Sequence, residues 1–292
     1  MPLLLPRVGL VTDSTGCLPA ASVTAHGVDV VPLVLVADGV ERAEGEIAGE
    51  ELTEVLTRAK KLGTSRPSPA AFLEAYRRAA ARGCEEVLSI HLSADLSGTT
   101  EAAVLAATRS PIPVEVVDSR SIGMGLGYAV ETAAEVVDAG GGAAEAGAAA
   151  RARAQDTTLT FCVQSLDYLR KGGRVGGAAA LLGTALAIKP LLALEDGRIE
   201  AVAKVRTATR AVTQMVDRSV RAVQAAPAGA DVTVHQLDAE LRADQVVEAL
   251  RARCPEGTTV QVVELGAVTA CHVGPGTTAV VVAPRGARAA GR

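Results

Sequence analysis

Short runs of Val, Leu and Ile alternate with longer mixed stretches along the first half of the chain. Uninterrupted apolar runs of this length are typical of strands that are buried on both faces. The predicted strands are 8–11, 28–36, 87–92 and 114–117. The predicted helices between them are 50–60, 68–82 and 100–108. Strands that alternate with helices in this way predict a parallel, doubly wound α/β sheet.

The second half of the chain has a different pattern, after a break at Gly140-Gly141-Gly142 and an Ala-rich helix over 143–154. Asp196-Gly197 stands between two apolar stretches, which is a strong signal for a β-hairpin and hence for antiparallel strands. The other elements predicted here are strands 158–163, 232–235, 259–263 and 278–282, with helices 207–225 and 244–253.

These patterns predict two domains, in keeping with a length of 292 residues and about 150 residues per domain. Residues 1–154 are predicted to form a Rossmann-like α/β/α domain with a parallel, doubly wound sheet. Residues 155–292 are predicted to form a two-layer α/β domain with antiparallel strands. The basic tail of this second domain, 284–292, is predicted to be disordered.

The composition argues against several classes of function. The formal net charge is −4 and aromatic residues make up only 2% of the chain, whereas nucleic-acid binders usually carry a basic face and stacking aromatics. We therefore predict no nucleic-acid partner. The four histidines have no metal-ligand spacing to the five cysteines, so neither a metal site nor a cofactor is predicted.

The cysteines and the apolar segments bear on the cellular compartment. An odd number of cysteines without a C-x-x-C pair favours reduced thiols over a disulfide framework. The first residues lack the basic start and long apolar stretch of a signal peptide, and the apolar runs are shorter than the about 20 residues that span a bilayer. The sequence predicts a cytoplasmic protein without a transmembrane segment and leaves its oligomeric state open.

Two polar loops precede predicted helices, at 63–69 and 93–99. The second loop also follows the carboxyl end of a predicted strand, which is where open α/β sheets bind ligands. Free N–H groups and a partial positive charge make a helix N-terminus suitable for an anion, and the hydroxyls of these loops add further donors. The alternative is plain helix capping, which either loop alone would favour.

A third loop, 271–277, is rich in Gly and Pro and contains His272. Gly274 and Gly276 allow the backbone to approach another group closely. A histidine in such a loop is a suitable cation for a carboxylate, because its charge is tunable near neutral pH. A solvent-facing or capping histidine is the alternative, and the residues alone leave both open.

The densest basic cluster is Arg170-Lys171-Gly172-Gly173-Arg174, and Lys189, Lys204 and Arg206 follow later. A short run of charge is usually a solvated surface. A cluster interrupted by two glycines is less usual and suits contact with a phosphate or an acidic partner.

Eight elements taken together, in this order and spacing, resemble the DegV family over nearly the whole chain. They are Val11-Thr12-Asp13-Ser14-Thr15, Thr64-Ser65 with Pro67-Ser68, His91-Leu92-Ser93 followed by Leu96-Ser97-Gly98-Thr99, Val117-Asp118-Ser119, Leu166-Asp167-Tyr168-Leu169-Arg170-Lys171-Gly172-Gly173-Arg174, Lys189-Pro190, Lys204-Val205-Arg206-Thr207, and His272-Val273-Gly274-Pro275-Gly276. Any one of these elements is a weak signal, whereas their combination is specific.

The resemblance implies a two-domain α/β protein of lipid metabolism and lipid transport that holds a long-chain fatty acid, such as palmitate or oleate, between its domains. It implies that Thr64 and Ser97 hydrogen-bond the carboxylate with His272 close by, and it makes their loop neighbours candidate ligand contacts as well. These neighbours are Ser65, Gly98 and Thr99. For some members it implies that the bound acid is presented to a separate fatty acid kinase, which makes the acyl phosphate.

The same resemblance makes this chain a carrier and not an enzyme. The basic residues are then candidates for contact with the kinase or with the acyl phosphate: Arg170, Lys171, Arg174 and Arg206. One departure from the family pattern is Asp95, whose carboxylate would oppose anion binding unless it points to solvent.

Some of these residues are also compatible with two other functions. A hydrolase could use Ser97 and His272 with Asp13 or Asp118, but no Gly-x-Ser-x-Gly elbow surrounds Ser97. A dinucleotide site is suggested by the glycines at 123–127, but their spacing differs from G-x-G-x-x-G. Close packing of a helix explains these glycines better.

Overall fold

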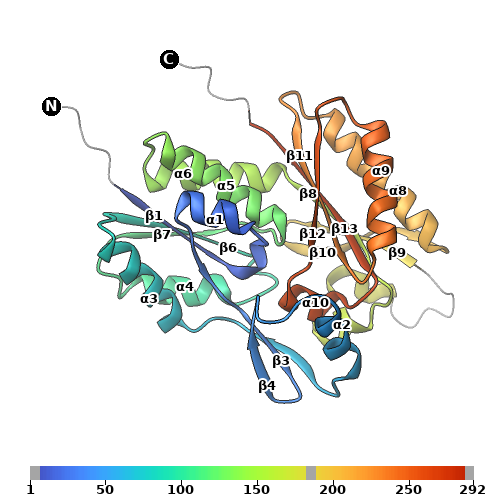
Figure 1. The fold of residues 1–292 in the computed structure, drawn as a ribbon, viewed down its shortest axis with the longest axis horizontal. Coiled ribbons are helices and arrows are strands. Elements are labelled where there is room, and N and C mark those ends of the chain that lie inside the picture. The colour runs from blue at the N-terminus through green and yellow to red at the C-terminus, as the bar shows by residue number, and fades with distance from the viewer. Residues whose placement is uncertain (1–6, 182–188, 287–292) are drawn as a thin grey trace. The chain divides into compact units, whose positions relative to one another are not determined.

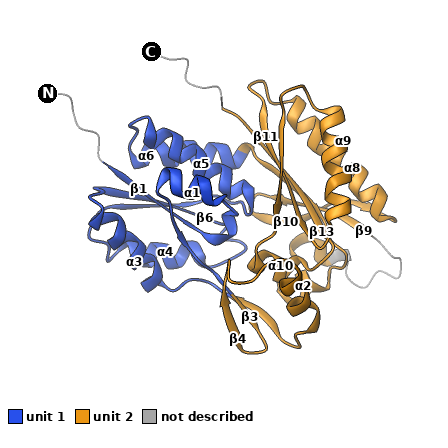
Figure 2. Ribbon diagram, viewed as in Figure 1, with its two compact units in different colours: residues 1–34, 65–155 blue, residues 35–64, 156–292 orange. Residues whose placement is uncertain are grey.

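The structure is a computed structural model of the chain, and it describes residues 7–181 and 189–286 (Figure 1). The chain divides into two compact units, which Figure 2 shows in different colours. The first contains residues 1–34 and 65–155, and the second contains residues 35–64 and 156–292. The predicted division into 1–154 and 155–292 did not include this exchange of the segment 35–64.

The first unit is built on a four-stranded parallel sheet with the strand order β2-β1-β6-β7. The strands are β1 (Val8–Asp13), β2 (Asp29–Val31), β6 (Glu86–His91) and β7 (Val114–Asp118). Each neighbouring pair is parallel. The uninterrupted apolar runs of the sequence are explained by this position, because helices cover both faces of the sheet.

Two hydrophobic cores lie on the two faces of this sheet. Helices α3 (Pro69–Ala81) and α4 (Thr99–Ala107) pack on one face, with Phe72 and Tyr76 fully buried. Helices α5 (Met124–Asp138) and α6 (Ala143–Asp156) pack on the other face, and α1 (Ala20–His26) lies against α5. This arrangement confirms the predicted α/β/α architecture.

The second unit contains a six-stranded sheet with the order β10-β9-β8-β13-β11-β12. The strands are β8 (Thr158–Cys162), β9 (Lys189–Glu195), β10 (Arg198–Val205), β11 (Ala230–Leu237), β12 (Thr259–Glu264) and β13 (Thr277–Pro284). Neighbours are antiparallel except β11 and β12. Helices α8 (Ala208–Gln224) and α9 (Glu240–Arg253) form the core with one face of the sheet. The separate antiparallel sheet is therefore as predicted.

The hairpin between β9 and β10 confirms the signal at Asp196-Gly197. Both residues have positive φ, at 49° and 79°. Two central residues of this kind form the turn whose twist matches that of the flanking strands. Residues 287–292 of the predicted disordered tail lie outside the described residues, and β13 extends to Pro284.

The predicted strand 28–36 is wrong, because it is two strands separated at Pro32 and Leu33. Pro32 has no N–H to donate to a ladder, and the Leu33 N–H donates to the Ser14 hydroxyl at 2.9 Å. β2 belongs to the parallel sheet, whereas β3 (Val34–Ala37) belongs to a small sheet with the order β4-β3-β5. The break at Pro32 thus begins the segment that belongs to the second unit.

This segment contributes β4 (Val40–Ala43), α2 (Gly49–Arg58) and β5 (Leu62–Ser65). Helix α2 contacts α10 (Ala267–Val273), which also contacts α7 (Asp167–Lys171). Two short 3₁₀ helices complete the described elements, at Ser14–Gly16 and Gly176–Leu181. Within the described ranges, no helix combines the length and the apolar character that crossing a membrane requires.

Candidate functional site

The carboxyl ends of β1 and β6 form the point in the first unit where the strand order reverses. The chain leaves β1 for β2 on one side, while β6 and β7 lie on the other side. Asp13 ends β1, His91 ends β6, and the loop 93–99 follows β6 directly. Ligands of open α/β sheets bind outside such a point, so this loop is well placed for one.

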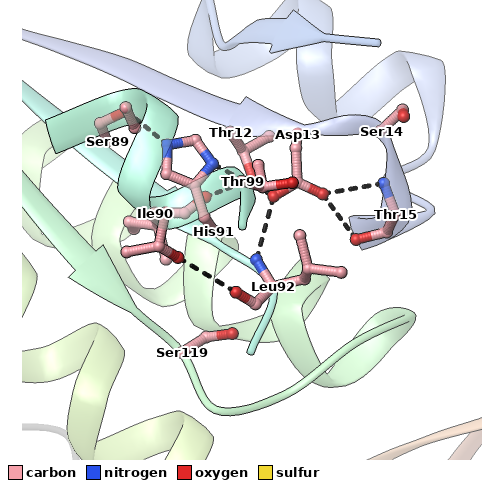
Figure 3. A network of polar contacts seen from close by, with 12 residues as sticks. Thr12, Asp13, Ser14, Thr15, Ser89, Ile90, His91, Leu92, Thr99 and Ser119 are labelled. Carbon is pink, nitrogen blue, oxygen red and sulfur yellow. Dashed lines mark hydrogen bonds and ion pairs between the residues drawn. The ribbon is translucent and has the colours of Figure 1, made fainter. Parts of the chain in front are cut away.

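A buried hydrogen-bond network holds these two strand ends together (Figure 3). One oxygen of Asp13 accepts from the Thr15 N–H at 3.1 Å and from the Thr15 hydroxyl at 2.5 Å. The other accepts from the Leu92 N–H at 3.0 Å and lies 3.1 Å from His91 Nδ1. The carboxylate therefore fixes the backbone at the start of the loop 93–99.

The network continues from His91 to Ser89 and Tyr76. His91 Nε2 lies 2.7 Å from the Ser89 hydroxyl, which lies 3.0 Å from the Tyr76 hydroxyl. Ser89, His91 and Asp13 thus have the hydrogen-bond order of a hydrolase triad. However, Ser89 and His91 are 0% exposed, so no substrate reaches the serine. The group stabilises the strand ends and has no route to chemistry.

The loop 93–99 gathers hydroxyls at the start of helix α4. The Ser97 hydroxyl lies 2.8 Å from the Thr99 hydroxyl, and Gly98 stands immediately before the helix. Ser97 is half-buried, while Thr99 is fully buried. The predicted ligand residues Ser97, Gly98 and Thr99 therefore form one cluster, with free N–H groups of the helix beside the Ser97 hydroxyl.

Arg66 supplies a cation to this cluster, and the sequence reasoning missed it. Its guanidinium donates to the Gly98 carbonyl oxygen at 3.0 Å and to the Glu101 carboxylate at 2.8 Å. A Cβ added at Gly98 would lie 1.9 Å from the guanidinium, so the glycine makes room for the arginine. The only available signal was a basic residue between two serines in the loop 63–69, which has no specific meaning without the fold.

Asp95 does not oppose an anion at this place. It is exposed, and its carboxylate lies 3.6 Å from the Arg120 guanidinium. The sequence predicted that Asp95 would oppose anion binding unless its carboxylate points to solvent, and the residue is exposed.

In the second unit, the structure brings Thr64 and His272 together. Thr64 lies on strand β5, and its hydroxyl is 2.9 Å from His272 Nε2. His272 lies in the last turn of helix α10, with Gly274 as the C-cap. The expected loops around both residues were therefore wrong: β5 pairs with β3, and the Gly/Pro segment follows a helix.

The environment of His272 favours a neutral imidazole, which argues against the cation that the sequence left open. Burial and the nearby positive charge of Arg174 lower the pKa of His272 to about 4. The end of a helix favours a charged histidine by only about 1 kcal/mol, which is less than this shift represents. At neutral pH, His272 can therefore donate or accept a hydrogen bond but contributes no charge.

The other ring nitrogen of His272 faces Gly172. Nδ1 is buried and makes no hydrogen bond with any described residue. A Cβ added at Gly172 would lie 2.2 Å from Nδ1, so only glycine leaves room for the ring. The Arg174 guanidinium donates to the Gly172 carbonyl oxygen at 2.6 Å, which places it beside the histidine.

Comparison with known proteins agrees with this fold. A family model described as "Uncharacterised protein, DegV family" matches residues 7–285. The chain belongs to the DegV family. A DegV domain-containing protein of Streptomyces coelicolor is 47% identical over 280 residues, which are 96% of this chain and 99% of the relative.

Two solved structures resemble this DegV-family chain closely. A DegV family protein from Thermus thermophilus, described with fatty acid binding, has a TM-score of 0.88 and 34% identity, covering 96% of this chain and all of the other. A Thermotoga maritima protein whose structure is described as revealing a fatty acid binding function has a TM-score of 0.82 and 26% identity. It covers 96% of this chain and 100% of its own.

The remaining candidate residues of this DegV-family chain make no side-chain hydrogen bond to Thr64, His272, Ser97 or Thr99 in the described structure. The Ser65 hydroxyl makes only a long bond of 3.4 Å to the Arg66 carbonyl oxygen. Arg170 pairs with Asp167 at 3.2 Å on the exposed side of α7. Lys171 and Arg206 are exposed. Of the predicted basic cluster, the structure therefore places Arg174 beside His272 and leaves the others at the surface.

The glycines noted at 123–127 serve packing, as expected. A Cβ at Gly127 would lie 2.6 Å from the Gly16 carbonyl oxygen, so helix α5 approaches the chain after β1 closely. In the parts of the chain that the structure describes, no group of three or more His, Cys, Asp or Glu side chains is placed to hold a metal ion.

Proposed function

We propose that this DegV-family chain binds a long-chain fatty acid through its carboxylate and presents the acid to a separate, ATP-dependent fatty acid kinase. The observation that carries the proposal is the pair of a neutral, half-buried His272 and the Thr64 hydroxyl at 2.9 Å. The fatty acid binding described for the Thermus thermophilus and Thermotoga maritima relatives supports it.

The pair can serve a carboxylate through a directed chain of hydrogen bonds. With its proton on Nε2, the imidazole donates to Thr64 Oγ1. The Thr64 hydroxyl proton is then left to donate to a carboxylate oxygen. A hydrogen bond to a charged group of this kind contributes about 1.5–3 kcal/mol.

In the first unit, Ser97 offers an equivalent hydroxyl. Thr99 can donate to Ser97 at 2.8 Å, which leaves the Ser97 proton for an anion. The N-terminus of the nine-residue helix α4 favours negative charge at the same loop, while the charge of Arg66 is paired with Glu101. The expectation from the family that Thr64 and Ser97 serve a single carboxylate, in an acid held between two domains, stays a prediction.

The free energy of binding would come mainly from the acyl chain. Each buried CH₂ gains about 0.8 kcal/mol, so a palmitoyl tail contributes on the order of 10 kcal/mol before ordering costs. The carboxylate contacts then mainly set orientation, because an unpaired buried charge would be very unfavourable.

We propose binding without catalysis, with a hydrolase using Ser97 and His272 as the alternative. The hydrogen-bond partner of Ser97 is Thr99, and that of His272 is Thr64, so neither has a catalytic partner within its own unit. A serine-directed phosphonate probe separates the two functions. A carrier stays unlabelled at Ser97, whereas labelling there would establish an activated serine and contradict the proposal.

The first experiment is to extract lipid from the purified full chain and identify it by mass spectrometry. The delipidated chain is then titrated with palmitate and oleate. Thr64→Val should lower the affinity about tenfold or more, while Thr64→Ser keeps the hydroxyl and the affinity. Thr213→Val, at an exposed threonine of α8, is the control. A delipidated chain that takes up neither acid would refute the proposed function.

The kinase step involves the exposed cations in our proposal. Arg170, Lys171 and Arg206 can steer an acidic partner or contact the acyl phosphate, and Arg174 beside His272 can do the latter. Arg170→Ala should leave fatty acid affinity unchanged but reduce acyl phosphate formation by the kinase, more steeply at low salt. An unchanged rate at both salt concentrations would assign Arg170 to the solvated surface.

A further inference from the structure

A cavity of about 220 Å³, open to solvent on one side, lies between strand β8 and helix α8 of the second unit, two elements that contact each other. It is lined by Thr158, Thr160, Arg218, Ser219 and Arg221. By the volume of liquid water, it has room for about seven water molecules. Every lining residue is polar, although the helix and the sheet form a hydrophobic core beside it.

The periodicity of the two elements aims these side chains at one place. Thr158 and Thr160 are two residues apart on β8, so they point to the same face of the sheet. Their register partners on β13 are Val282 and Val280, which belong to the core under α8. Arg218 and Arg221 are three residues apart on α8 and hence share one face of the helix.

The hydroxyls of Thr158 and Thr160 on the strand are available to a ligand in the described structure. Thr160 is only 5% exposed, yet neither it nor Thr158 makes a side-chain hydrogen bond with any described residue. The Thr160 hydroxyl oxygen is not a fully buried atom, so it opens onto the cavity, where it can donate to a ligand or to water. Ser219 differs, because its hydroxyl already donates to the Met215 carbonyl oxygen at 2.9 Å.

The charge of the cavity is positive. Arg221 makes no ion pair with a described carboxylate, and Arg218 has only a long contact of 3.6 Å to Glu195. Two guanidinium groups with two hydroxyls match the oxygens of a phosphoryl dianion, which accepts several hydrogen bonds at once. A carboxylate or chloride would leave some of these donors unused.

We propose that this cavity is a binding site for a phosphomonoester dianion, separate from the fatty acid site. Arg218 and Arg221 supply the charge, while Thr158 and Thr160 donate from the strand. The ligand chemistry is common to inorganic phosphate, a soluble phosphate monoester and a phosphatidic acid headgroup. The contact of Glu195 with Arg218 opposes binding and sets the affinity.

The test is a titration of the full chain, at constant ionic strength in chloride, with inorganic phosphate, with glycerol 3-phosphate, and with phosphatidylcholine vesicles that contain phosphatidic acid. Calorimetry follows the soluble ligands and co-sedimentation follows the vesicles. Saturable binding of at least one is expected, and the arm that binds tightest identifies the source. No binding in any arm would overturn the proposal.

The variants are expected to change the affinity in opposite directions, whereas a general loss of folding would weaken binding in all of them. Arg221→Gln and the near-isosteric Thr160→Val should each weaken binding about fivefold or more. Glu195→Gln should strengthen binding about twofold to fivefold, because it releases Arg218. Arg251→Gln, at an exposed arginine of α9, is the matched control and should bind like wild type. Equal binding by wild type, Thr160→Val and the Arg218→Gln/Arg221→Gln double variant would show that the cavity is not the site.

Discussion

Two histidines of this protein are both hydrogen-bonded to a hydroxyl, yet their surroundings differ in one decisive respect. His91, in the first unit, has a partner for each ring nitrogen, Asp13 and Ser89, and is 0% exposed. His272, in the second unit, bonds only Thr64, and its Nδ1 is buried against Gly172 with no partner among the described residues.

The difference separates a structural group from a candidate ligand-binding group. A fully satisfied and sealed network stabilises the fold and has no capacity left for a ligand. In a half-satisfied and partly exposed pair, the Thr64 hydroxyl keeps a proton that it can donate to a ligand. Serine, histidine and aspartate in the order of a triad are thus no evidence of catalysis here, whereas an incomplete pair marks the candidate site.

Breaking the sealed network should have the largest effect. Asp13→Asn replaces one carboxylate oxygen, which accepts two of the four hydrogen bonds, by an amide NH₂ and removes a buried charge, so we expect a loss of about 3–5 kcal/mol in the free energy of unfolding. Urea denaturation measures it. The surface pair His26–Asp138, with its aspartate 58% exposed, provides the control Asp138→Asn, which should cost under about 1 kcal/mol. Similar losses in the two variants would contradict the structural role of the network.

The second largest expected effect is a loss of stability in acid that comes from His272, the incompletely paired histidine. Because the pKa of His272 is lowered to about 4, the unfolded chain binds its proton first as the pH falls below about 6.5. Stability that is complete at pH 7 is then lost towards pH 4, by about 2 kcal/mol between pH 7 and pH 5. His235 should also contribute a loss of stability in acid, because burial lowers its pKa to about 4.

Urea denaturation at the two pH values checks this loss. His272→Gln should be less sensitive to acid than wild type, while His26→Gln at the surface serves as the control. An unchanged pH dependence in His272→Gln would mean that His272 is not held neutral.

Filling the space beside the imidazole should disturb the site without breaking the network of the first unit. Gly172→Ala puts a methyl group where Nδ1 lies, while its φ of −75° suits any residue. We expect the ring to shift away from Thr64 and fatty acid affinity to fall about tenfold, measured by titration. Gly173→Ala tests φ alone, because its φ is +71° with nothing within 4 Å. A larger loss of affinity there would argue against the contact at Gly172.

The smallest expected effect is the pH dependence of fatty acid affinity in a His272 variant. A cationic His272 would make the loss of affinity in His272→Ala greater at pH 6 than at pH 8. Because the pKa is lowered to about 4, the imidazole of the unliganded protein is neutral at both values, so we expect the same loss at both. Titration of wild type and variant at the two pH values measures it. A loss several-fold greater at pH 6 would indicate that the acid restores the charge of His272 on binding.

The local signals of the sequence predicted most of the elements well. Continuous apolar runs located β1, β6 and β7, and Asp196-Gly197 located the β9–β10 turn, because these features depend on residues close in the chain. The combination of short polar elements identified the family, and through the resemblance it proposed Thr64, Ser97 and His272 as site residues. The break at Pro32 was missed, although proline is itself a local signal against a continuous strand.

The tertiary structure decided which of these residues act together and in which state. The sequence named Thr64 and His272 as neighbours only by resemblance, and it left open the charge of the histidine, which burial and Arg174 disfavour. Arg66 beside Gly98, the satisfied state of His91 and the polar cavity of β8 and α8 had no signal in the sequence. Desolvation, unpaired atoms and close approach depend on residues that are distant along the chain, so only the folded arrangement determines them.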